Sequence, residues 1–200
     1  MSIEVSTSTR SVCTTKSCAM RKVLQSEFFN RQVVTVAREL LGKFLVRTQE
    51  GTTTTHMITE TEAYDGPKDK ACHAYKGRTT RTEPMFDEPA TIYVYFTYGM
   101  HYMLNIVTGP KEYAAAVLVR GVEGIEGPGR LTKALHINKT LNHQLLSKKT
   151  GLWVEDRGIV IPKKVILKTP RIGIDYAGEW KEKPYRFVIK KARGSQSLSL

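Results

Sequence analysis

Only one stretch of this chain repeats its apolar residues with the period of a helix, and most of the chain after it is typical of short strands separated by turns. The apolar positions of 33–41 recur at helical spacing, with Asn30 as the expected N-cap and Gly42 just after the expected end. A second, short helix is expected over 131–135. Strands are expected at 44–48, 55–64, 92–97, 102–107, 115–122, 152–155, 160–167 and 185–190. The pattern predicts an α+β fold: one domain built on antiparallel sheet, with few helices.

The N-terminal residues differ from the rest of the chain. Residues 1–22 are rich in Ser and Thr, carry several basic residues, and show neither a helical nor a strand period. We expect a flexible basic arm over 1–22, followed by a single domain over 23–200. A cleaved targeting segment is the alternative, against which Glu4 and the lack of an amphipathic face both count.

The charge balance favours a polyanionic partner. Against 19 Asp and Glu the chain has 31 Lys and Arg, which gives a formal net charge of +12. We expect nucleic acid before membrane, because no basic amphipathic helix stands out. No apolar run approaches the roughly 20 residues that cross a bilayer, so we expect a soluble protein.

Motifs for several common chemistries are missing. The three cysteines form no C-x-x-C pair, which argues against a zinc site or a disulfide framework and favours a reducing, intracellular compartment. H-E-x-x-H, G-x-x-x-x-G-K-[ST] and G-x-S-x-G do not occur. Metalloprotease, P-loop and serine-hydrolase functions are therefore not expected.

Two carboxylates and a tyrosine alternate within one expected strand. Glu60, Glu62 and Tyr64 would point to the same face of an extended backbone. In so basic a chain, acidic groups that face DNA weaken binding unless they do chemistry, such as activating a water as a general base. A solvated strand face is the other interpretation, and the spacing alone does not decide between them.

An aromatic hairpin forms the second candidate. Tyr93, Tyr95, Tyr98 and Tyr102 crowd it, Phe96 faces the opposite side, and its return strand carries the polar Asn105. Such rings can stack on an extruded base, and a ring at the hairpin tip can fill the gap that the base leaves. Core packing explains aromatic strands equally well.

Other candidate residues each have two interpretations, one functional and one structural. His73 follows Cys72, which is no zinc pattern, so we expect a hydrogen-bonding or stacking histidine. Arg120 ends an apolar run and is either a buried donor or a surface charge. Residues 127–129 are a phosphate cradle before a helix or an ordinary turn. Basic residues suited to DNA approach, or simply to solvation, are Lys163, Lys164, Lys168 and Arg171, and those from Lys181 to Arg193.

Several ordered blocks together resemble the alkyladenine DNA glycosylase family, also called 3-methyladenine or methylpurine DNA glycosylases. The blocks are residues 60–64, 78–82 with Met85-Phe86, 93–100, 127–135, 170–174, 177–179 and 184–187. The resemblance spans about residue 26 to residue 192. Two departures are Arg130, where a lysine is usual, and Thr59, where a valine is common. The first puts a phosphate contact in doubt.

The resemblance implies a catalytic role for Glu62 and Arg120, and a substrate-binding role for His73. Glu62 matches the general base that deprotonates a water for attack on the anomeric carbon. Arg120 matches the arginine that helps to hold this water and the carboxylate. His73 matches a pocket histidine that hydrogen-bonds near the sugar and phosphate.

The resemblance also implies how the base is held. Tyr64 and Tyr95 match the rings that sandwich the flipped base, and Tyr98 matches the residue that intercalates in its place. Asn105 matches the asparagine that clashes with the amino group of normal guanine. The implied fold is a compact mixed domain on a curved antiparallel sheet, in agreement with the strand pattern.

The implied function is base-excision repair of 3-methyladenine, 7-methylguanine, hypoxanthine and ethenoadenine by a monofunctional glycosylase. We expect no cofactor and no metal, a monomer, duplex DNA with a damaged purine as partner, and no membrane. The expected compartment is the bacterial cytoplasm and nucleoid, or the nucleus in a eukaryote. The rivals are a non-catalytic module that binds damaged DNA or structured RNA, and an RNA-modifying or formyl-transfer enzyme, which would need a cofactor-binding loop.

Overall fold

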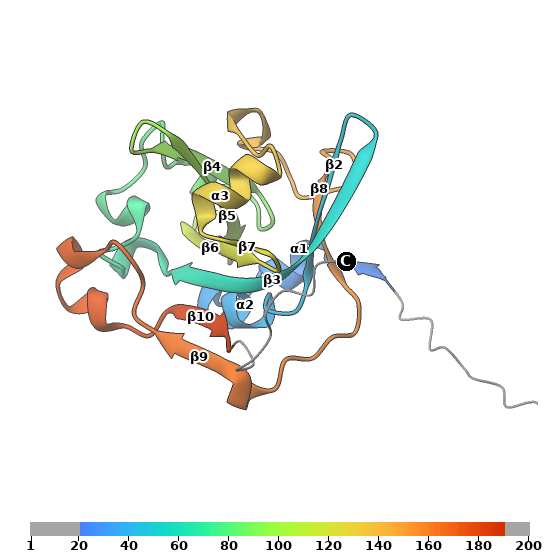
Figure 1. Cartoon of the computed structure of the whole chain (residues 1–200). Helices are drawn as coiled ribbons and strands as arrows, with labels where there is room; N and C mark the ends of the chain where they lie inside the picture. The colour runs from blue at the N-terminus through green and yellow to red at the C-terminus, as the bar shows by residue number, and fades with distance from the viewer. Residues whose placement is uncertain (1–20, 191–200) are drawn as a thin grey trace, which may run out of the picture.

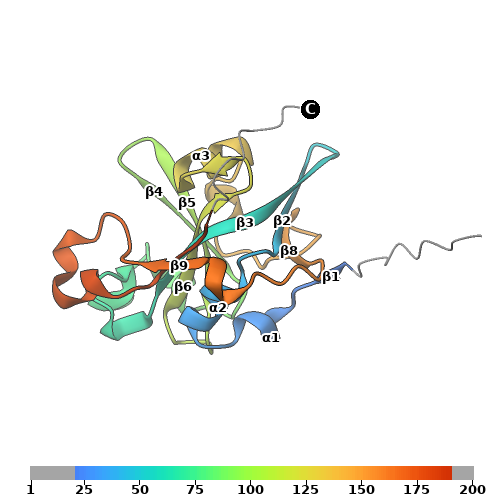
Figure 2. The same ribbon diagram turned by 60° about the horizontal axis from the view of Figure 1, so that its bottom comes forward.

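The computed structural model describes residues 21–190, and its described part is built on one large, strongly curved sheet (Figures 1 and 2). The strands are β1 (Lys22–Val23), β2 (Phe44–Gln49), β3 (Thr52–Tyr64), β4 (Ile92–Thr97), β5 (His101–Thr108), β6 (Ala115–Val122), β7 (Ile125–Glu126), β8 (Leu152–Asp156), β9 (Ile166–Thr169) and β10 (Arg186–Ile189). The α-helices are α1 (Ser26–Phe29), α2 (Val33–Glu39) and α3 (Pro128–Ala134). The 3-10 helices are η1 (Gly66–Lys68), η2 (His73–Lys76), η3 (Glu83–Phe86), η4 (Lys139–Leu141), η5 (Lys163–Val165) and η6 (Asp175–Glu182).

All strand pairs are antiparallel, and the main path through the sheet runs β1-β8-β2-β3-β6-β5-β4. The long strand β3 makes the bend. Its first half pairs with β2, and its second half lies between β6 and β10, with register shifts between Ile58 and Thr61. Irregularities of this kind increase local twist and curl a sheet. The α+β class on an antiparallel sheet with few helices is therefore confirmed.

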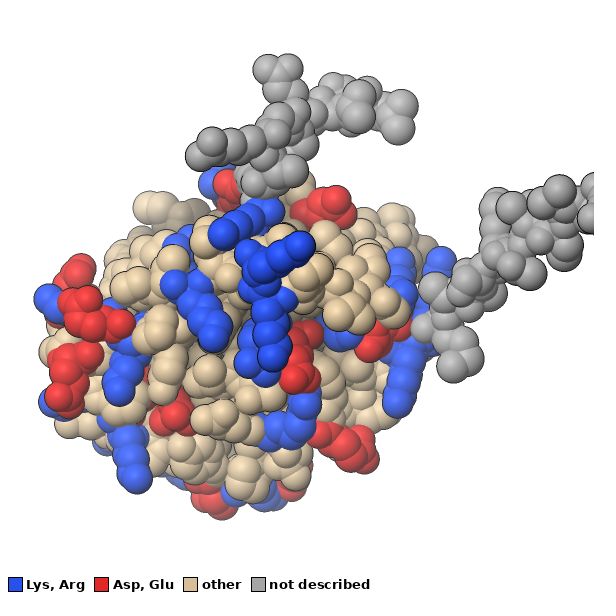
Figure 3. All heavy atoms as spheres, turned by 90° about the horizontal axis from the view of Figure 1, so that it is seen from below, with Lys and Arg blue, Asp and Glu red and all other residues tan. Residues whose placement is uncertain are grey.

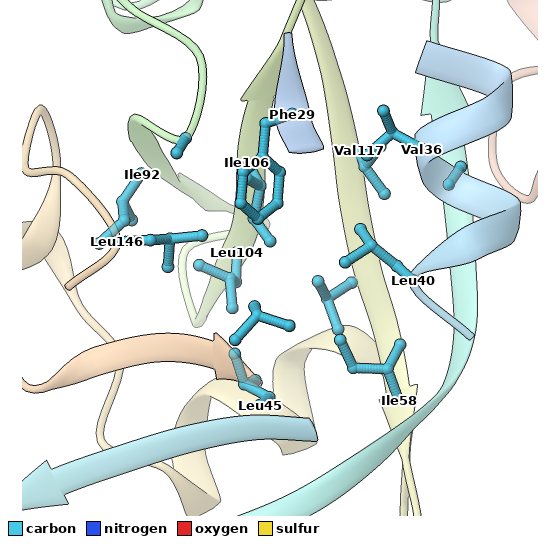
Figure 4. Packing of buried hydrophobic residues seen from close by; sticks show 14 of the residues in the cluster. Phe29, Val36, Leu40, Leu45, Ile58, Ile92, Leu104, Ile106, Val117 and Leu146 are labelled. Atoms are coloured by element: carbon cyan, nitrogen blue, oxygen red, sulfur yellow. The ribbon is translucent and has the colours of Figure 1, made fainter. Parts of the chain in front are cut away.

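The main core fills one face of this sheet. Phe29 of α1 and Val36 of α2 pack with Ile58 of β3, Ile106 of β5 and Val117 of β6, all fully buried (Figure 4). Burying one such side chain contributes roughly 1.5–3 kcal/mol. The helix α2 forms because its apolar residues return to one face every turn, and that face rests on β3 and β6.

The opposite face of the same strands is left for the site. Because side chains alternate along a strand, residues one position away from the core set point to the other side. Tyr93 and Tyr95 of β4, Leu118 of β6 and Tyr64 of β3 lie there. This face is covered by the segments of η1–η3 and of η6, which meet at one end of the sheet (Figures 1 and 2).

The sequence located most strands well. The expected strands over 92–97 and 115–122 match β4 and β6 at both ends, and those at 44–48, 55–64, 102–107, 152–155 and 185–190 differ from the observed strands by a few residues. The expected strand over 160–167 is wrong: Pro162 leads into the 3-10 helix η5, and only Ile166–Thr169 is extended. Proline has no N–H for a ladder, which explains the interruption.

The helix ends also differ from expectation. Asn30 is not the N-cap of α2. It is the C-cap of α1, and Gln32 precedes α2 without a side-chain cap. The helix expected over 131–135 begins earlier, at Pro128, because proline suits the first turn, where its missing N–H costs nothing.

The expected arm can be followed only at its end. Residues 1–20, with Cys13 and Cys18, lie outside the described residues. Lys22, placed in the arm by sequence, pairs with Asp156 in the first strand, so the sheet begins before residue 23. Cys72 is buried and free. In the part of the chain that the structure describes, no helix is long and apolar enough to cross a membrane.

Candidate active site

A pocket of about 340 Å³ opens on the face of the sheet opposite the main core. Small-molecule sites usually have volumes of roughly 300–1,000 Å³, so this pocket can accept a single base. It is lined by Tyr64, Ala71, His73, Met85, Tyr93, Tyr95, Thr97, Tyr98, Met103, Leu118, Arg120, Pro128, Ile172, Gly173, Ile174 and Tyr176. The structure thus brings five of the seven residues singled out from sequence to one pocket. Glu62 and Asn105 are buried beside it.

Glu62 is the most constrained group of the site. Its side chain is 0% exposed, and three donors hold its carboxylate. Oε1 accepts from the Ile172 backbone N–H at 2.9 Å, while Oε2 accepts from the Tyr64 hydroxyl at 2.9 Å and from Arg120 Nη1 at 3.4 Å. Tyr64 and Arg120 also line the pocket, so the carboxylate lies directly behind that wall.

Burial raises the pKa of Glu62 above its ordinary value. Arg120, the Ile172 N–H and the Tyr64 hydroxyl each act in the opposite direction but do not outweigh the loss of hydration. A carboxylate with a raised pKa binds a proton more tightly and is a better base near neutral pH. The environment therefore suits proton abstraction better than a solvated strand face would.

Arg120 is a buried donor, which decides between its two readings. Its side chain is 13% exposed, and its Nε lies 2.8 Å from Glu60 Oε1, which also accepts from Arg186 Nε at 2.7 Å. Burial disfavours the Arg120 charge, but Glu62 and Glu60 more than compensate and raise its pKa. Glu60 and Glu62 therefore share one fixed cation between them.

The pocket walls are aromatic. His73 Nδ1 lies 3.0 Å from the Tyr93 hydroxyl, and the His73 ring meets Tyr95 edge-on with 4.5 Å between the ring centres. Burial, with help from Arg81, lowers the pKa of His73 to about 4, so this histidine is neutral at pH 7. His73 is thus hydrogen-bonded to a tyrosine hydroxyl, and its implied role near the sugar and phosphate stays a prediction.

The rim of the pocket is exposed. Tyr98 is 78% exposed at the hairpin tip and adopts a left-handed backbone with φ of 52°, which is strained for a residue other than glycine. Met100 beside it is 67% exposed, and Tyr176 of η6 is 69% exposed. Tyr98 and Tyr176 thus present two unburied rings at the opening.

Two hairpin residues lie differently from the rest of the aromatic set. Tyr102 packs against Phe96, with ring centres 4.9 Å apart, on the far side of the sheet from the pocket. Asn105 is 4% exposed, and its amide nitrogen donates to the carbonyls of Tyr93 and Met103, each at 3.3 Å. It shares the pocket-side face of β5 with Met103 but does not line the pocket itself.

The expected basic surface needs one correction. Lys163, Lys164 and Lys168 are exposed, but Arg171 is buried and paired with Asp69, so it is no part of a DNA-facing patch. On the face seen from below, Lys and Arg occur in small groups together with Asp and Glu, rather than as one patch of a single sign (Figure 3).

Gly129, in the first turn of α3, has a packing role. A Cβ on Gly129 would lie 2.8 Å from the His101 ring, so only glycine lets the helix approach the hairpin this closely. Packing thus accounts for Gly129, and the positive φ of 91° at Gly127 supports the interpretation of an ordinary turn before the helix.

Sequence reasoning missed several pocket residues. Met85, Met103 and Ile174 are ordinary core types, and the N–H of Ile172 is a backbone group that no side-chain pattern announces. Tyr176 was equally undetected, since it lies in a segment without a strand or helix period. Tyr93 had a signal from its place in the aromatic hairpin, while Met85, Ile172 and Ile174 fell within blocks of the family resemblance without a role assigned to them.

The described residues contain no group of three or more His, Cys, Asp or Glu side chains that could hold a metal ion. The expectations of a metal-free and cofactor-free reaction stay predictions, because they concern the reaction itself.

Comparisons with known proteins find relatives over most of the chain. The model of the methylpurine-DNA glycosylase (MPG) family matches residues 27–127 and 122–193. A Myxococcus xanthus protein named "Putative 3-methyladenine DNA glycosylase" is 43% identical over 185 residues, covering 88% of this chain and 93% of the relative. Relatives of the same name come from Methanocella arvoryzae, at 43% over 190 residues with 85% and 94% covered, and Chlamydia pneumoniae, at 38% over 200 residues with 88% and 100% covered.

These matches cover most of the described chain, including every block on which the resemblance rested. They confirm the expectation of a DNA glycosylase that acts in DNA repair. The chain belongs to the methylpurine-DNA glycosylase family.

Proposed function

We propose that this protein flips alkylated or deaminated purines out of duplex DNA and hydrolyses their glycosidic bond, leaving an intact strand with an abasic site. The observation that carries the proposal is Glu62: a fully buried carboxylate, held by three donors directly behind an aromatic pocket. Its substrates are the 3-methyladenine, 7-methylguanine, hypoxanthine and ethenoadenine class.

In the proposed reaction, Glu62 takes a proton from a water as its oxygen attacks the anomeric carbon. The bond to the purine breaks with its electron pair leaving on the base, and positive charge develops on the sugar. The ionised carboxylate stabilises that charge as well as activating the water. Arg120, fixed between Glu60 and Glu62, holds the carboxylate in its orientation.

Base selection is proposed to occur in the aromatic pocket. Tyr64 and Tyr95 supply faces for stacking, which favours electron-poor, alkylated rings. Tyr98 is free to enter the DNA duplex in place of the extruded nucleotide, because most of its side chain is exposed. Asn105 is proposed to exclude guanine from its position beside Tyr93 and Met103.

We also propose that the enzyme acts as a monomer, wherever the cell keeps its DNA, without metal or cofactor. Among residues 21–190, no lysine lines the pocket as an amine nucleophile, so Schiff-base formation and strand cleavage are not expected. Much of the affinity for DNA comes from the net charge of +12, through release of counterions, and falls with salt.

A non-catalytic module that binds distorted DNA is the rival function. It would need the basic surface and the aromatic hairpin but not Glu62. Burying this carboxylate costs free energy, because the charge is removed from water. A group of that kind is more readily explained by chemistry than by binding alone.

The deciding experiment incubates the protein with duplexes that carry hypoxanthine, ethenoadenine or 7-methylguanine and measures abasic sites by alkaline cleavage. We expect base release that survives EDTA, with strands intact until alkali is added and no adduct trapped by borohydride. Tight binding to lesion duplex with no base release would support the rival. Loss of activity on chelation, restored by a divalent ion, would overturn the metal-free reaction.

A further inference from the structure

A buried ion pair lies under the site and takes no part in the chemistry proposed so far. The side chains of Asp69 and Arg171 are both 0% exposed. Arg171 Nη2 donates to Asp69 Oδ1 at 2.9 Å, and its Nη1 donates to Asp69 Oδ2, so the contact is two-pronged. Such geometry fixes direction as well as distance. No DNA contact can account for Arg171, because it does not reach the surface.

The remaining contacts of Arg171 join three parts of the site. Its Nη1 donates to the carbonyl of Ala63 at 2.8 Å, and its Nη2 to the carbonyl of Trp180 at 3.3 Å. Its guanidinium lies over the Tyr64 ring, 4.8 Å from the centre. Strand β3, the segment after η1 and the helix η6 therefore meet on one side chain.

Asp69 is itself held on the other side. Its Oδ2 accepts from the Asp65 backbone N–H and its Oδ1 from the Ala71 N–H, each at 3.0 Å. The carboxylate is thus anchored by its own loop, and Arg171 is placed relative to that loop. Fixing the side chain of Arg171 also restricts the backbone of the next residue in the sequence.

That neighbour is Ile172, whose backbone N–H donates to Glu62 Oε1 at 2.9 Å. Ile172 is 51% exposed, so its own side chain does little to hold the backbone there. We propose that Arg171, locked by Asp69, is a positioning residue that sets the Ile172 N–H against the Glu62 carboxylate. The inference rests on the proposed role of Glu62 and names how its geometry is maintained.

The proposal predicts a pH effect of a definite sign, because the Ile172 N–H is one of the groups that lower the pKa of Glu62. If the N–H moves away, this pKa rises, and excision fails at a higher pH as the medium is acidified. The other charged and titratable groups near Glu62 are Glu60, Tyr64, Arg120, Arg186, Arg171 and Tyr95. None of these is changed by substituting Asp69.

The test is Asp69→Asn, with single-turnover release of 7-methylguanine measured from pH 5 to pH 9. This lesion carries its own positive charge and leaves without being protonated. The fall in rate on the acidic side of the pH profile, the acidic limb, therefore reports protonation of Glu62. Loss of positioning should move the limb upward by about one pH unit. Direct electrostatics has the opposite sign, because removing the negative charge of Asp69 favours ionised Glu62 and moves the limb downward.

Arg171→Lys is the second variant. Lysine keeps the charge but cannot form the two-pronged contact, so it should move the limb in the same direction as Asp69→Asn. Each variant is assayed below its own melting temperature, checked by circular dichroism. The matched control is Glu155→Gln, which removes the charge that pairs Glu155 of β8 with Arg157; no residue of β8 lines the pocket. It should leave the limb in place.

The outcomes separate this inference from the proposed function. An upward shift in both Asp69 and Arg171 variants, with binding to abasic duplex within about twofold of the parent, supports positioning. A lower plateau without a shift, or a downward shift, overturns it and leaves a purely structural pair. If the parent releases no base, or Glu62→Gln releases base at the parent rate, the proposed function itself has failed.

Discussion

The floor and the rim of the pocket are built in opposite ways. On the floor, Glu62 is fully buried on a strand with neighbours on both sides, and each carboxylate oxygen has a donor. On the rim, Tyr98 and Met100 are mostly exposed, at a hairpin tip with a left-handed backbone. The floor has its hydrogen bonds formed before substrate arrives, whereas the side chains of the rim are still exposed to water.

This difference matches the two tasks of an enzyme that works on a base inside a duplex. The reacting groups must be fixed before the base arrives, since reorganising them during reaction would cost rate. The groups that open the duplex must reach out and trade water for base contacts. We therefore expect floor substitutions to affect the chemical step and rim substitutions to affect capture of the nucleotide.

The largest effect is expected on the floor. Glu62→Gln keeps the shape of the side chain and removes its basicity, so base release should fall about 10²-fold or more while binding to lesion duplex changes little. Single-turnover excision and a titration of labelled duplex measure the two separately. Excision near the parent rate would remove Glu62 from the mechanism.

A smaller effect is expected on the rim. Tyr98→Ala should slow excision from well-paired duplex about tenfold, because a stacked ring is worth about 1–3 kcal/mol and partly offsets the cost of extrusion. The loss should shrink on mismatched lesions, which are easier to extrude. Tyr102→Ala is the control within the same hairpin, since Tyr102 faces away from the pocket. Equal losses on paired and mismatched duplex would count against a wedge at Tyr98.

Asn105 is buried beside the pocket, and its substitution tests where selection occurs. If Asn105 excludes guanine as proposed, Asn105→Ser should raise release of normal guanine severalfold, by relieving the proposed clash with its amino group. The same change removes donations to two strand carbonyls, so some stability should be lost too. The ratio of guanine to hypoxanthine release is the measurement. An unchanged ratio, with a lowered melting temperature, would make Asn105 a structural residue only.

The smallest effect is on stability, and its sign follows from the pKa of Glu62. Because the folded-state pKa is raised, the carboxylate costs stability once the pH exceeds its unfolded value, and the cost grows as the pH rises through the folded value. Glu62→Gln should therefore melt higher than the parent at pH 8, by about 3 °C for each kcal/mol. The gap should close near pH 4, and a gap that widened on acidification would contradict the raised pKa.

The strands and their faces could be predicted from the sequence. Alternation in 59–64 and 92–97 placed Glu62 beside Tyr64 and the hairpin aromatics in one set, because side chains of a strand alternate whatever the strand packs against. Glu50 and Gly51 both have a positive φ in the turn between β2 and β3, and turn residues end strands for an equally local reason. The family resemblance added roles that spacing alone left open.

Contacts between distant segments could not be predicted in this way. Arg171 belongs to a run of basic residues in sequence, yet it lies buried against Asp69, 102 positions earlier. The strand expected over 160–167 failed because apolar alternation does not reveal that Pro162 begins a 3-10 turn. Burial of a side chain depends on which distant segments pack against it, and a local sequence pattern does not indicate which segments these are.

The sequence by itself determined which residues share a strand face, and with it the candidates Glu62, Tyr64 and Tyr95, because backbone periodicity is a local property. Only the tertiary structure decided that Glu62 is desolvated, that Arg120 lies between two carboxylates, and that Ile172 donates from 110 residues away. The raised pKa on which the proposed role of Glu62 depends comes from desolvation, against which the Arg120 and Ile172 contacts act. Desolvation is a tertiary property, since the loss of water around a charge depends on everything packed against it.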